Sequence, residues 1–509
     1  MKRIIFSALA MLALAIGAAG IAAATPHFHD GNDLWIDPNE SGWGLNLFHQ
    51  GDTLFASLFV YGPDGKARWY TGSSLVGTDA GRDRATVYTG ALYESTGPAV
   101  TSVFDPSRVT RRQVGTMSIE LGSEGNPSRN YAQITYDVDG VRVTKHAYPF
   151  SFVAMGLSGS YTGYQASPGG ARDEMNANVA LNNGSFAMST TNSVGTSCTY
   201  SGPQNANGSV FHVAGSYSCT DGRSGSFVLR DVDVTQHGFS AKLSNGTSMT
   251  DMVALRTSTR IRGDGYRTDL WLKRSESGWG LNIIEQGDTL FGTLFVYDAE
   301  GKPRWYSASN LAYEQCAPPD AASDCNGRYR GALFESTGPY FGTSFNAAAV
   351  TRRQVGMMKM DTYANDTAHL EFTIDGVTVV KNDLRRFAFR TNSLAGSYAG
   401  HITSLENNDR GMQVGAMTIE VSYSGDLMTV TMRGSRGTCT ITDRAFQYGR
   451  QVSVSGAYDC GGPKFGRLLL SDLYVTWSGF TGRVDFGTDP AVNVFYPIGR
   501  IEAVRTAPH

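Results

Sequence analysis

The sequence has no second apolar segment, after its first 24 residues, that could cross a bilayer as a helix, which takes about 20 residues. It also has no run of basic or acidic residues, and the formal net charge is only −3. A basic patch is the usual footprint of a nucleic-acid partner. We therefore expect no nucleic-acid partner, and no transmembrane segment once the N-terminal segment has been removed.

Common catalytic and cofactor motifs are missing too. We find no Gly-x-Ser-x-Gly, His-Glu-x-x-His, phosphate-binding loop or dinucleotide fingerprint, which predicts no cofactor. Asp37, Asn39 and Glu40 have the spacing of calcium ligands, but the second copy of this segment begins Lys273-Arg274. Because cations repel a metal ion, we expect no shared metal site.

The nine histidines are not duplicated in the two halves of the chain. His49 corresponds to Glu285, and His146 corresponds to Asn382. A serine nucleophile needs a histidine base, so a site common to both halves cannot use one. A triad confined to one half stays open.

The cysteines include no Cys-x-x-Cys pair, which argues against zinc. Their even number in an exported chain instead predicts disulfides. The spacing favours three local pairs: Cys198–Cys219, Cys316–Cys325 and Cys439–Cys460.

The N-terminus is typical of an export signal. Lys2 and Arg3 precede an apolar segment from Ile4 to Ile21, and Ala22-Ala23-Ala24 supplies small residues for cleavage before Thr25. A membrane anchor is the alternative. We predict that residues 1–24 are a cleaved signal peptide and that the protein is secreted or periplasmic.

No segment shows a convincing helical period, whereas glycine is abundant, with 60 residues. Short alternating or apolar segments separated by turns such as Asp64-Gly65 and Asp139-Gly140 indicate antiparallel strands. We predict an all-β fold, with roughly seven strands in its first module. The pattern leaves a small antiparallel β-barrel and a β-sandwich equally open.

Most of the chain is duplicated. Glu40-Ser41-Gly42-Trp43-Gly44-Leu45-Asn46 recurs as Glu276 to Asn282, 236 positions later. The repeat divides the chain into a tandem A-B-A-B array, with an exposed linker expected near Arg260–Arg267. The expected modules are A1 (33–153), B1 (157–257), A2 (267–390) and B2 (394–506).

The blocks ESGWG, QGDTLF, RWY and GAL[YF]ESTGP resemble modules of secreted proteobacterial proteins that are mostly uncharacterised, and the two-cysteine B module resembles the module that often follows them. The resemblance covers nearly all of the mature chain. It implies export and an all-β structure, and it carries no catalytic residues. The Gly-Ser-Tyr opening of the B modules is also similar to calycin-like barrels, in shape only.

Two acidic residues recur in both halves, as Glu40/Glu276 and Glu94/Glu335. A carboxylate pair can hydrolyse glycosidic bonds at a suitable separation. The competing interpretation is structural: ion pairs with Arg111-Arg112 or Arg352-Arg353 at strand ends. A hydrolase of a polymeric substrate, using Glu94 and Glu335 as acid or base, is therefore the alternative function, and a structural surface or matrix component is the third.

Duplicated aromatic residues are the strongest functional signal. Aromatic faces stack on sugars and aromatic ligands, although burial in a β core is the common alternative. Trp43 and Trp279 stand between glycines, which permit close approach of a ligand. We expect a non-catalytic binding or adhesion-type protein with two similar sites for a glycan or other polymer. The candidate ligand residues are Trp43, Asn46, Trp69, Tyr70, Trp279, Asn282, Trp305 and Tyr306.

Overall fold

The computed structural model describes residues 31–506 with several gaps. The gaps are residues 79–85, 123–130, 154–155, 168–171, 183, 209, 235–237, 247, 258–266, 317–324, 364–365, 405–413, 436, 461–465, 476–478 and 488–495. The predicted signal peptide, residues 1–24, lies outside the described residues. So does most of the predicted linker, but Arg267 at its end is described, is only 1% exposed and forms an ion pair with Glu285. The expectation that this residue is exposed was wrong.

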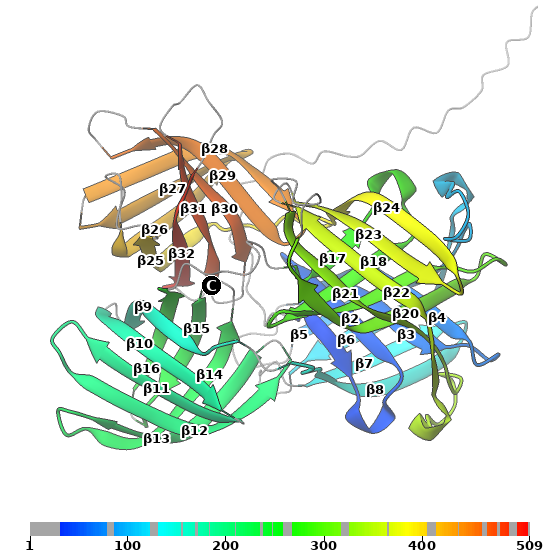
Figure 1. The fold of residues 1–509 in the computed structure, drawn as a ribbon, viewed down its shortest axis with the longest axis horizontal. Coiled ribbons are helices and arrows are strands. Elements are labelled where there is room, and N and C mark those ends of the chain that lie inside the picture. The colour runs from blue at the N-terminus through cyan, green and yellow to red at the C-terminus, as the bar shows by residue number, and fades with distance from the viewer. Residues whose placement is uncertain are drawn as a thin grey trace, which may run out of the picture.

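The protein consists of four closed antiparallel barrels of eight strands each (Figure 1). Consecutive strands are neighbours in every barrel, and the first strand pairs with the last. This confirms the predicted all-β tandem repeat. The sequence left barrel and sandwich open. The modules are barrels, because the pairing of the first strand with the last leaves no free sheet edge.

Each A barrel contains eight strands and two short 3-10 helices. A1 contains β1 (Asp33–Ile36), η1 (Pro38–Glu40), β2 (Gly44–Gln50), β3 (Thr53–Tyr61), β4 (Ala67–Thr78), β5 (Thr86–Thr96), η2 (Pro106–Arg108), β6 (Thr110–Leu121), β7 (Ala132–Val138) and β8 (Val141–Pro149). A2 contains β17 (Asp269–Leu272), η3 (Arg274–Glu276), β18 (Gly280–Gln286), β19 (Thr289–Tyr297), β20 (Pro303–Glu314), β21 (Cys325–Thr337), η4 (Ala347–Ala349), β22 (Thr351–Tyr363), β23 (Thr367–Ile374) and β24 (Val377–Arg386).

Each B barrel contains eight strands. B1 contains β9 (Gly159–Ala166), β10 (Arg172–Asn182), β11 (Ser185–Asn192), β12 (Ser197–Asn207), β13 (Val210–Cys219), β14 (Ser224–Val234), β15 (Gly238–Ser244) and β16 (Met249–Arg256). B2 contains β25 (Gly396–Ser404), β26 (Gly415–Ser424), β27 (Leu427–Gly434), β28 (Gly437–Tyr448), β29 (Gln451–Asp459), β30 (Arg467–Val475), β31 (Gly479–Gly487) and β32 (Tyr496–Arg505).

The estimate of roughly seven strands in A1 was one too low. The sequence analysis missed β1, which has four residues and is too short to show an alternating pattern. This strand closes the barrel, because it pairs with β2 on one side and with β8 on the other. The hairpin turn expected at Asp139-Gly140 is present, with positive φ of 50° and 81° at the two residues.

The three predicted disulfides are confirmed. The sulfur atoms of Cys198–Cys219, Cys316–Cys325 and Cys439–Cys460 lie 2.03, 1.96 and 2.09 Å apart. In B1, Cys198 and Cys219 are direct cross-strand neighbours on β12 and β13. Disulfides of this kind fit an oxidising extracellular or periplasmic location.

The two A barrels pack side by side, and so do the two B barrels, with the A pair on the right of Figure 1 and the B pair on the left. Strand β3 shows why the A barrels associate, since all nine of its residues are buried. One face of the strand fills the A1 barrel, and the other face is covered by A2. The core of A2 accordingly continues into Phe48, Phe55 and Phe59 of A1.

The duplicated blocks meet across this A1–A2 interface in reciprocal pairs. The indole nitrogen of Trp69 donates to the carbonyl of Val296, and that of Trp305 donates to the carbonyl of Val60. The amide of Gly97 donates to the carbonyl of Gly301. The two halves of the chain are therefore arranged as a pseudo-symmetric dimer.

The Gln-Gly-Asp turns bind the segment that follows the other A barrel. The Gln50 side chain donates to the carbonyl of Phe387 and accepts from the amide of Phe389, each at 2.9 Å. Gln286 makes the same two contacts, at the same distances, with Phe150 and Phe152. Each half thus holds the connection between the two barrels of the other.

The B barrels contact each other through a smaller apolar cluster of Tyr164, Val253, Ala399 and Val504. The hydroxyl of Tyr164 donates to the carbonyl of Ala399 at 2.5 Å. Among the described residues, no helix is long and apolar enough to cross a membrane.

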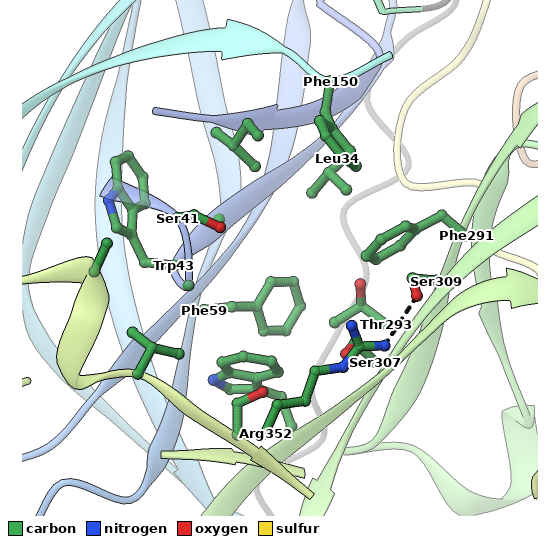
Figure 2. Close-up of a pocket in the computed structure, with 17 residues that line it drawn as sticks. Leu34, Ser41, Trp43, Phe59, Phe150, Phe291, Thr293, Ser307, Ser309 and Arg352 are labelled. Atoms are coloured by element: carbon green, nitrogen blue, oxygen red, sulfur yellow. Dashed lines mark hydrogen bonds between the residues drawn. The ribbon is translucent and has the colours of Figure 1, made fainter. Parts of the chain in front are cut away.

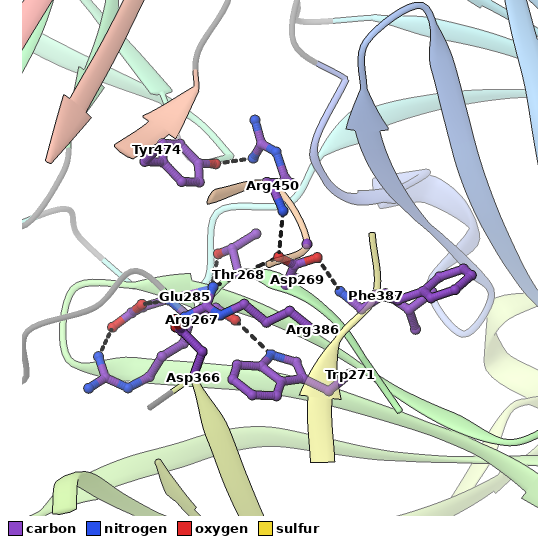
Figure 3. Close-up of polar contacts among 12 residues, drawn as sticks. Arg267, Thr268, Asp269, Trp271, Glu285, Asp366, Arg386, Phe387, Arg450 and Tyr474 are labelled. Atoms are coloured by element: carbon purple, nitrogen blue, oxygen red, sulfur yellow. Dashed lines mark hydrogen bonds and ion pairs between the residues drawn. The ribbon is translucent and has the colours of Figure 1, made fainter. Parts of the chain in front are cut away.

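A2 joins B2 through a buried carboxylate, shown in Figure 3. Asp269 accepts from the backbone amide of Arg450 at 3.0 Å, and Arg386 lies 3.8 Å away. Burial raises the pKa of Asp269 to about 6 although both arginines oppose the shift. Gly449 has φ of 59°, and a Cβ on it would stand 2.0 Å from the Asp269 carboxylate. Only glycine lets this loop approach the aspartate.

Candidate ligand-binding site at the A1–A2 interface

A cavity of about 530 Å³ lies between the two A barrels (Figure 2). The exposed side chains of Ser41 and Arg352 stand in its lining, so the cavity reaches solvent at both residues. The lining comprises Leu34, Ile36, Ser41, Gly42, Trp43, Gly44, Phe59 and Phe150 from A1, and Phe291, Thr293, Trp305, Ser307, Ser309, Ser336, Ala347, Val350 and Arg352 from A2.

The two barrels contribute different chemistry to this cavity. The A1 wall is mainly apolar, and the A2 wall carries hydroxyl groups and a guanidinium group. Figure 2 shows Leu34, Phe59 and Phe150 on one side, and Thr293, Ser307 and Arg352 across the cavity from them. A ligand there meets an apolar surface on one face and hydrogen-bonding groups on the other.

Trp43 is held rigidly at the edge of the cavity. Its indole nitrogen donates to the Glu40 carboxylate at 3.0 Å, and Lys145 binds the same carboxylate oxygen at 2.6 Å. Gly42, the residue before it, has φ of 132°, and a Cβ there would lie 2.6 Å from Val350 of A2. The glycine is therefore required by the close approach of A2.

Among the described residues that line the cavity, Arg352 is the only one with a cationic side chain. It donates to the Ser309 hydroxyl at 3.0 Å and stacks on the Phe334 ring at 3.6 Å. No carboxylate of the described residues lies within ion-pair distance of it. Partial burial lowers the pKa of Arg352, whereas the hydrogen bonds that neighbouring Arg353 donates to Asp375 and Glu335 raise the pKa of Arg353.

Asn46 and Asn282 are buried without hydrogen-bond partners in the described structure. They are 1% and 0% exposed, and neither amide atom of either side chain has a partner. Leaving such a group unpaired costs about 1–3 kcal/mol. Both belong to the duplicated block, and interface packing does not account for their polarity.

Neither asparagine is among the residues that line the cavity, but strand register places each of them next to a lining residue. On A1, Asn46 is opposite Leu34, which lines the cavity. On A2, Asn282 is opposite Thr293, which in turn is opposite Ser307, and both of these line the cavity. Directly opposite residues share a sheet face. Both amides therefore belong to the faces that A1 and A2 turn toward each other.

The pseudo-symmetry provides an equivalent set of residues on the other side of the interface. Arg111 donates to the Ser73 hydroxyl at 2.7 Å and stacks on the Tyr93 ring at 3.5 Å, as Arg352 does on Phe334. Gly278 approaches Val109 of A1 as Gly42 approaches Val350 of A2. The chain therefore carries two matched groups of residues.

The other predicted ligand residues are buried in the A1–A2 packing. Trp69 and Tyr70 are 2% and 5% exposed, and Trp305 and Tyr306 are 6% and 8% exposed. Trp305 lines the cavity as well as bonding across the interface. Tyr70 packs edge-on against Phe341 of A2. Trp279, 2% exposed, is held by Glu276 as Trp43 is held by Glu40.

Each recurrent carboxylate is engaged in ion pairs. Glu94 binds Arg112 at 2.9 Å, and Arg112 also binds Asp139 at 2.5 Å. In A2, Glu335 binds Arg353 at 2.8 Å with Asp375 completing the group. Glu276 binds Lys381 at 2.6 Å. The contacts of Glu94 and Glu335 match the structural interpretation with arginine partners, whereas Glu276 pairs with a lysine.

The described residues contain no group of three or more His, Cys, Asp or Glu side chains that could hold a metal ion. The lining residues Ser307, Ser309 and Arg352 were missed as candidate site residues. Thr351-Arg352-Arg353-Gln354 does recur from Thr110 to Gln113, so the repeat itself contained a signal. The sequence interpretation considered Arg352 only as a structural ion-pair partner of a glutamate.

Compared with known proteins, the chain matches no protein-family model, and it shows no significant similarity to a curated protein. The fold and the interface residues therefore carry the functional argument that follows.

Proposed function

We propose that the protein is an exported, non-catalytic binding protein that takes a glycan or another polymer at two equivalent sites between A1 and A2. The observation that carries the proposal is the pair of buried, unpartnered asparagines in the duplicated block. Packing between the barrels explains the tryptophans, the glycines and Gln50 or Gln286 of the repeated blocks. It does not explain a buried amide that forms no bond.

The cavity supports a ligand with two kinds of surface. A pyranose ring has C–H bonds that pack on aromatic faces, and hydroxyl groups at its edge that bond to polar side chains. Phe150 and Phe291 supply half-buried rings, and Ser307 and Ser309 supply half-buried hydroxyls. Two sites on one rigid body increase the effective concentration of a repeating ligand, which favours a polymer.

Export is part of the proposal and rests on two features. The three disulfides fit an oxidising compartment, and the first 24 residues have the composition of a signal peptide. The alternative function, hydrolysis of a polymer by paired glutamates, has less support, because Glu94 and Glu335 each bind an arginine.

The test is a screen of the full mature chain on a glycan array, followed by calorimetry with each glycan that binds. We expect binding with two sites per chain. Ser309→Trp and Ser73→Trp each place a large side chain at one of the two equivalent positions. Each variant should lose one site and keep the other.

Ser226→Trp, on an exposed position of β14 in B1, is the matched control and should retain both sites. Melting curves of all three variants would show that the barrels remain folded. Full binding by the double variant Ser309→Trp/Ser73→Trp, or no glycan binding at all by the unmodified protein, would overturn the proposal.

A further inference from the structure

We propose that the ligand of the two A1–A2 sites is an acidic glycan, whose carboxylate or sulfate groups bind Arg352 at one site and Arg111 at the other. This inference rests on the proposed function and names the class of glycan. It follows from how the two arginines differ from their sequence neighbours.

Adjacent arginines in each half have opposite environments. Arg112 and Arg353 are neutralised, each by a Glu and an Asp at no more than 2.9 Å. Arg111 and Arg352 each bind only a serine hydroxyl and the face of an aromatic ring. Within the described residues, the first pair is saturated and the second pair lacks an anionic partner.

The geometry of Arg352 leaves donor capacity for an anion. A guanidinium group has five N–H donors in a planar fork, and Ser309 accepts from one nitrogen, Nη2. Stacking on Phe334 holds the guanidinium plane against the ring and leaves its edge available. A carboxylate or sulfate can accept two parallel hydrogen bonds from such an edge.

The remaining lining favours a sugar acid over a fatty acid. The hydroxyls of Thr293, Ser307 and Ser309 stand on the same wall of the cavity as Arg352. An alkyl chain would leave the hydroxyls of Thr293 and Ser307 without a ligand partner, whereas sugar hydroxyls can bond to them. The half-buried rings of Phe150 and Phe291 can pack on the C–H face of the sugar.

Duplication gives the inference a quantitative test. Arg111 and Arg352 occupy equivalent positions, so removing one should abolish one site and leave the other intact. A single variant should therefore reduce the stoichiometry from two to one. It should not weaken both sites equally.

The experiment uses an array of paired glycans that share a backbone and differ in charge, such as uronate oligomers and their methyl esters. We expect the acidic member of each bound pair to bind about ten-fold to hundred-fold more tightly, the range of one charged hydrogen-bonded contact. Arg352→Gln and Arg111→Gln should each leave one site, and the double variant none. Affinity should also fall as salt is added.

Arg433→Gln removes the same charge from an exposed ion pair in B2 and is the control for net charge. Equal binding of acidic and neutral members, with both arginine variants unaffected, would overturn this inference and leave the proposed function standing. Binding of no glycan would overturn both. Arginine-dependent binding of a C16 fatty acid, in place of glycans, would also overturn both.

Discussion

The indole nitrogen of Trp69 lies 2.9 Å from the carbonyl oxygen of Val296, a residue of the other half of the chain. Trp305 and Val60 form the reciprocal bond at 3.1 Å. Trp69→Phe removes the donor and leaves a buried carbonyl without it, which should destabilise the A1–A2 contact by about 1–3 kcal/mol. Trp35→Phe is the comparison, because Trp35 bonds to Gly31 within A1. Urea unfolding measures both costs.

Splitting the chain tests the interface more directly. The two half chains, residues 25–258 and 262–509, should each fold, because every barrel closes within its own half. Each should also self-associate through the exposed aromatic face. Mixed halves should form a 1:1 complex, measured by size-exclusion chromatography with light scattering.

Trp69→Phe should weaken this complex, and Trp35→Phe should not. Halves that stay monomeric after mixing would contradict the interface. Halves that never fold alone would show that closed barrels are insufficient and that the shared aromatic core is needed for folding.

The all-β class, the tandem repeat and the three disulfides were predictable because each depends on local pattern or on counting. The association of A1 with A2 was not. The all-buried strand β3 reads as an apolar segment whether a ligand, a second barrel or its own core covers it. The duplicated tryptophans likewise suggested a binding surface, and sequence alone could not place Trp69 against a carbonyl 227 positions away.

The candidate site residues fall into two groups: those that the repeat made predictable, and those that depend on the association of A1 with A2. Asn46 and Trp43 were named from the repeat, and both lie on the A1 face or edge that meets A2. Ser309 and Arg352 were not named, because their role depends on a cavity made by two barrels that are distant in sequence. Arg267 was expected in an exposed linker, but it is buried and forms an ion pair with Glu285 of β18.

Trp43→Ala measures how much the buried tryptophan side chain contributes to the stability of the fold. Because Trp43 is 4% exposed, truncation should cost about 3–5 kcal/mol of stability. Trp279→Ala should cost a similar amount, since it is 2% exposed and holds the equivalent contact to Glu276. Chemical denaturation is the measurement. A loss below about 1 kcal/mol would show that the rings contribute little to the core.

His401 predicts a pH dependence at the B1–B2 contact. It is 5% exposed, its ring centre lies 6.4 Å from that of Tyr164, and burial lowers its pKa to about 4, although Glu174 opposes the shift. Unfolded His401 takes up a proton near pH 6.5, and the folded form does so only near pH 4. The contribution of neutral His401 to the free energy of unfolding is therefore fully present at pH 7. It declines as the pH falls from 6.5 toward 4.

Between pH 7 and pH 5 this loss should be about 2 kcal/mol. Urea unfolding of the unmodified protein and of His401→Gln across that range isolates the effect. The stability difference between the two proteins should shrink on acidification. Parallel curves would mean that His401 is accessible to protons in the folded state.

Substitution of Glu94 and Glu335 distinguishes a binding protein from a hydrolase. Arg112 and Asp139, the two partners in the Glu94 group, are each 55% exposed, so Glu94→Gln should change stability by less than about 1 kcal/mol. Asp139→Asn is the matched control, because it removes the other carboxylate from the same arginine.

The non-catalytic proposal predicts that the double variant Glu94→Gln/Glu335→Gln binds its glycan as the unmodified protein does. It also predicts that neither protein releases reducing ends from the polymer. Release by the unmodified protein that is lost in the glutamate variant, and kept in Asp139→Asn/Asp375→Asn, would establish a hydrolase.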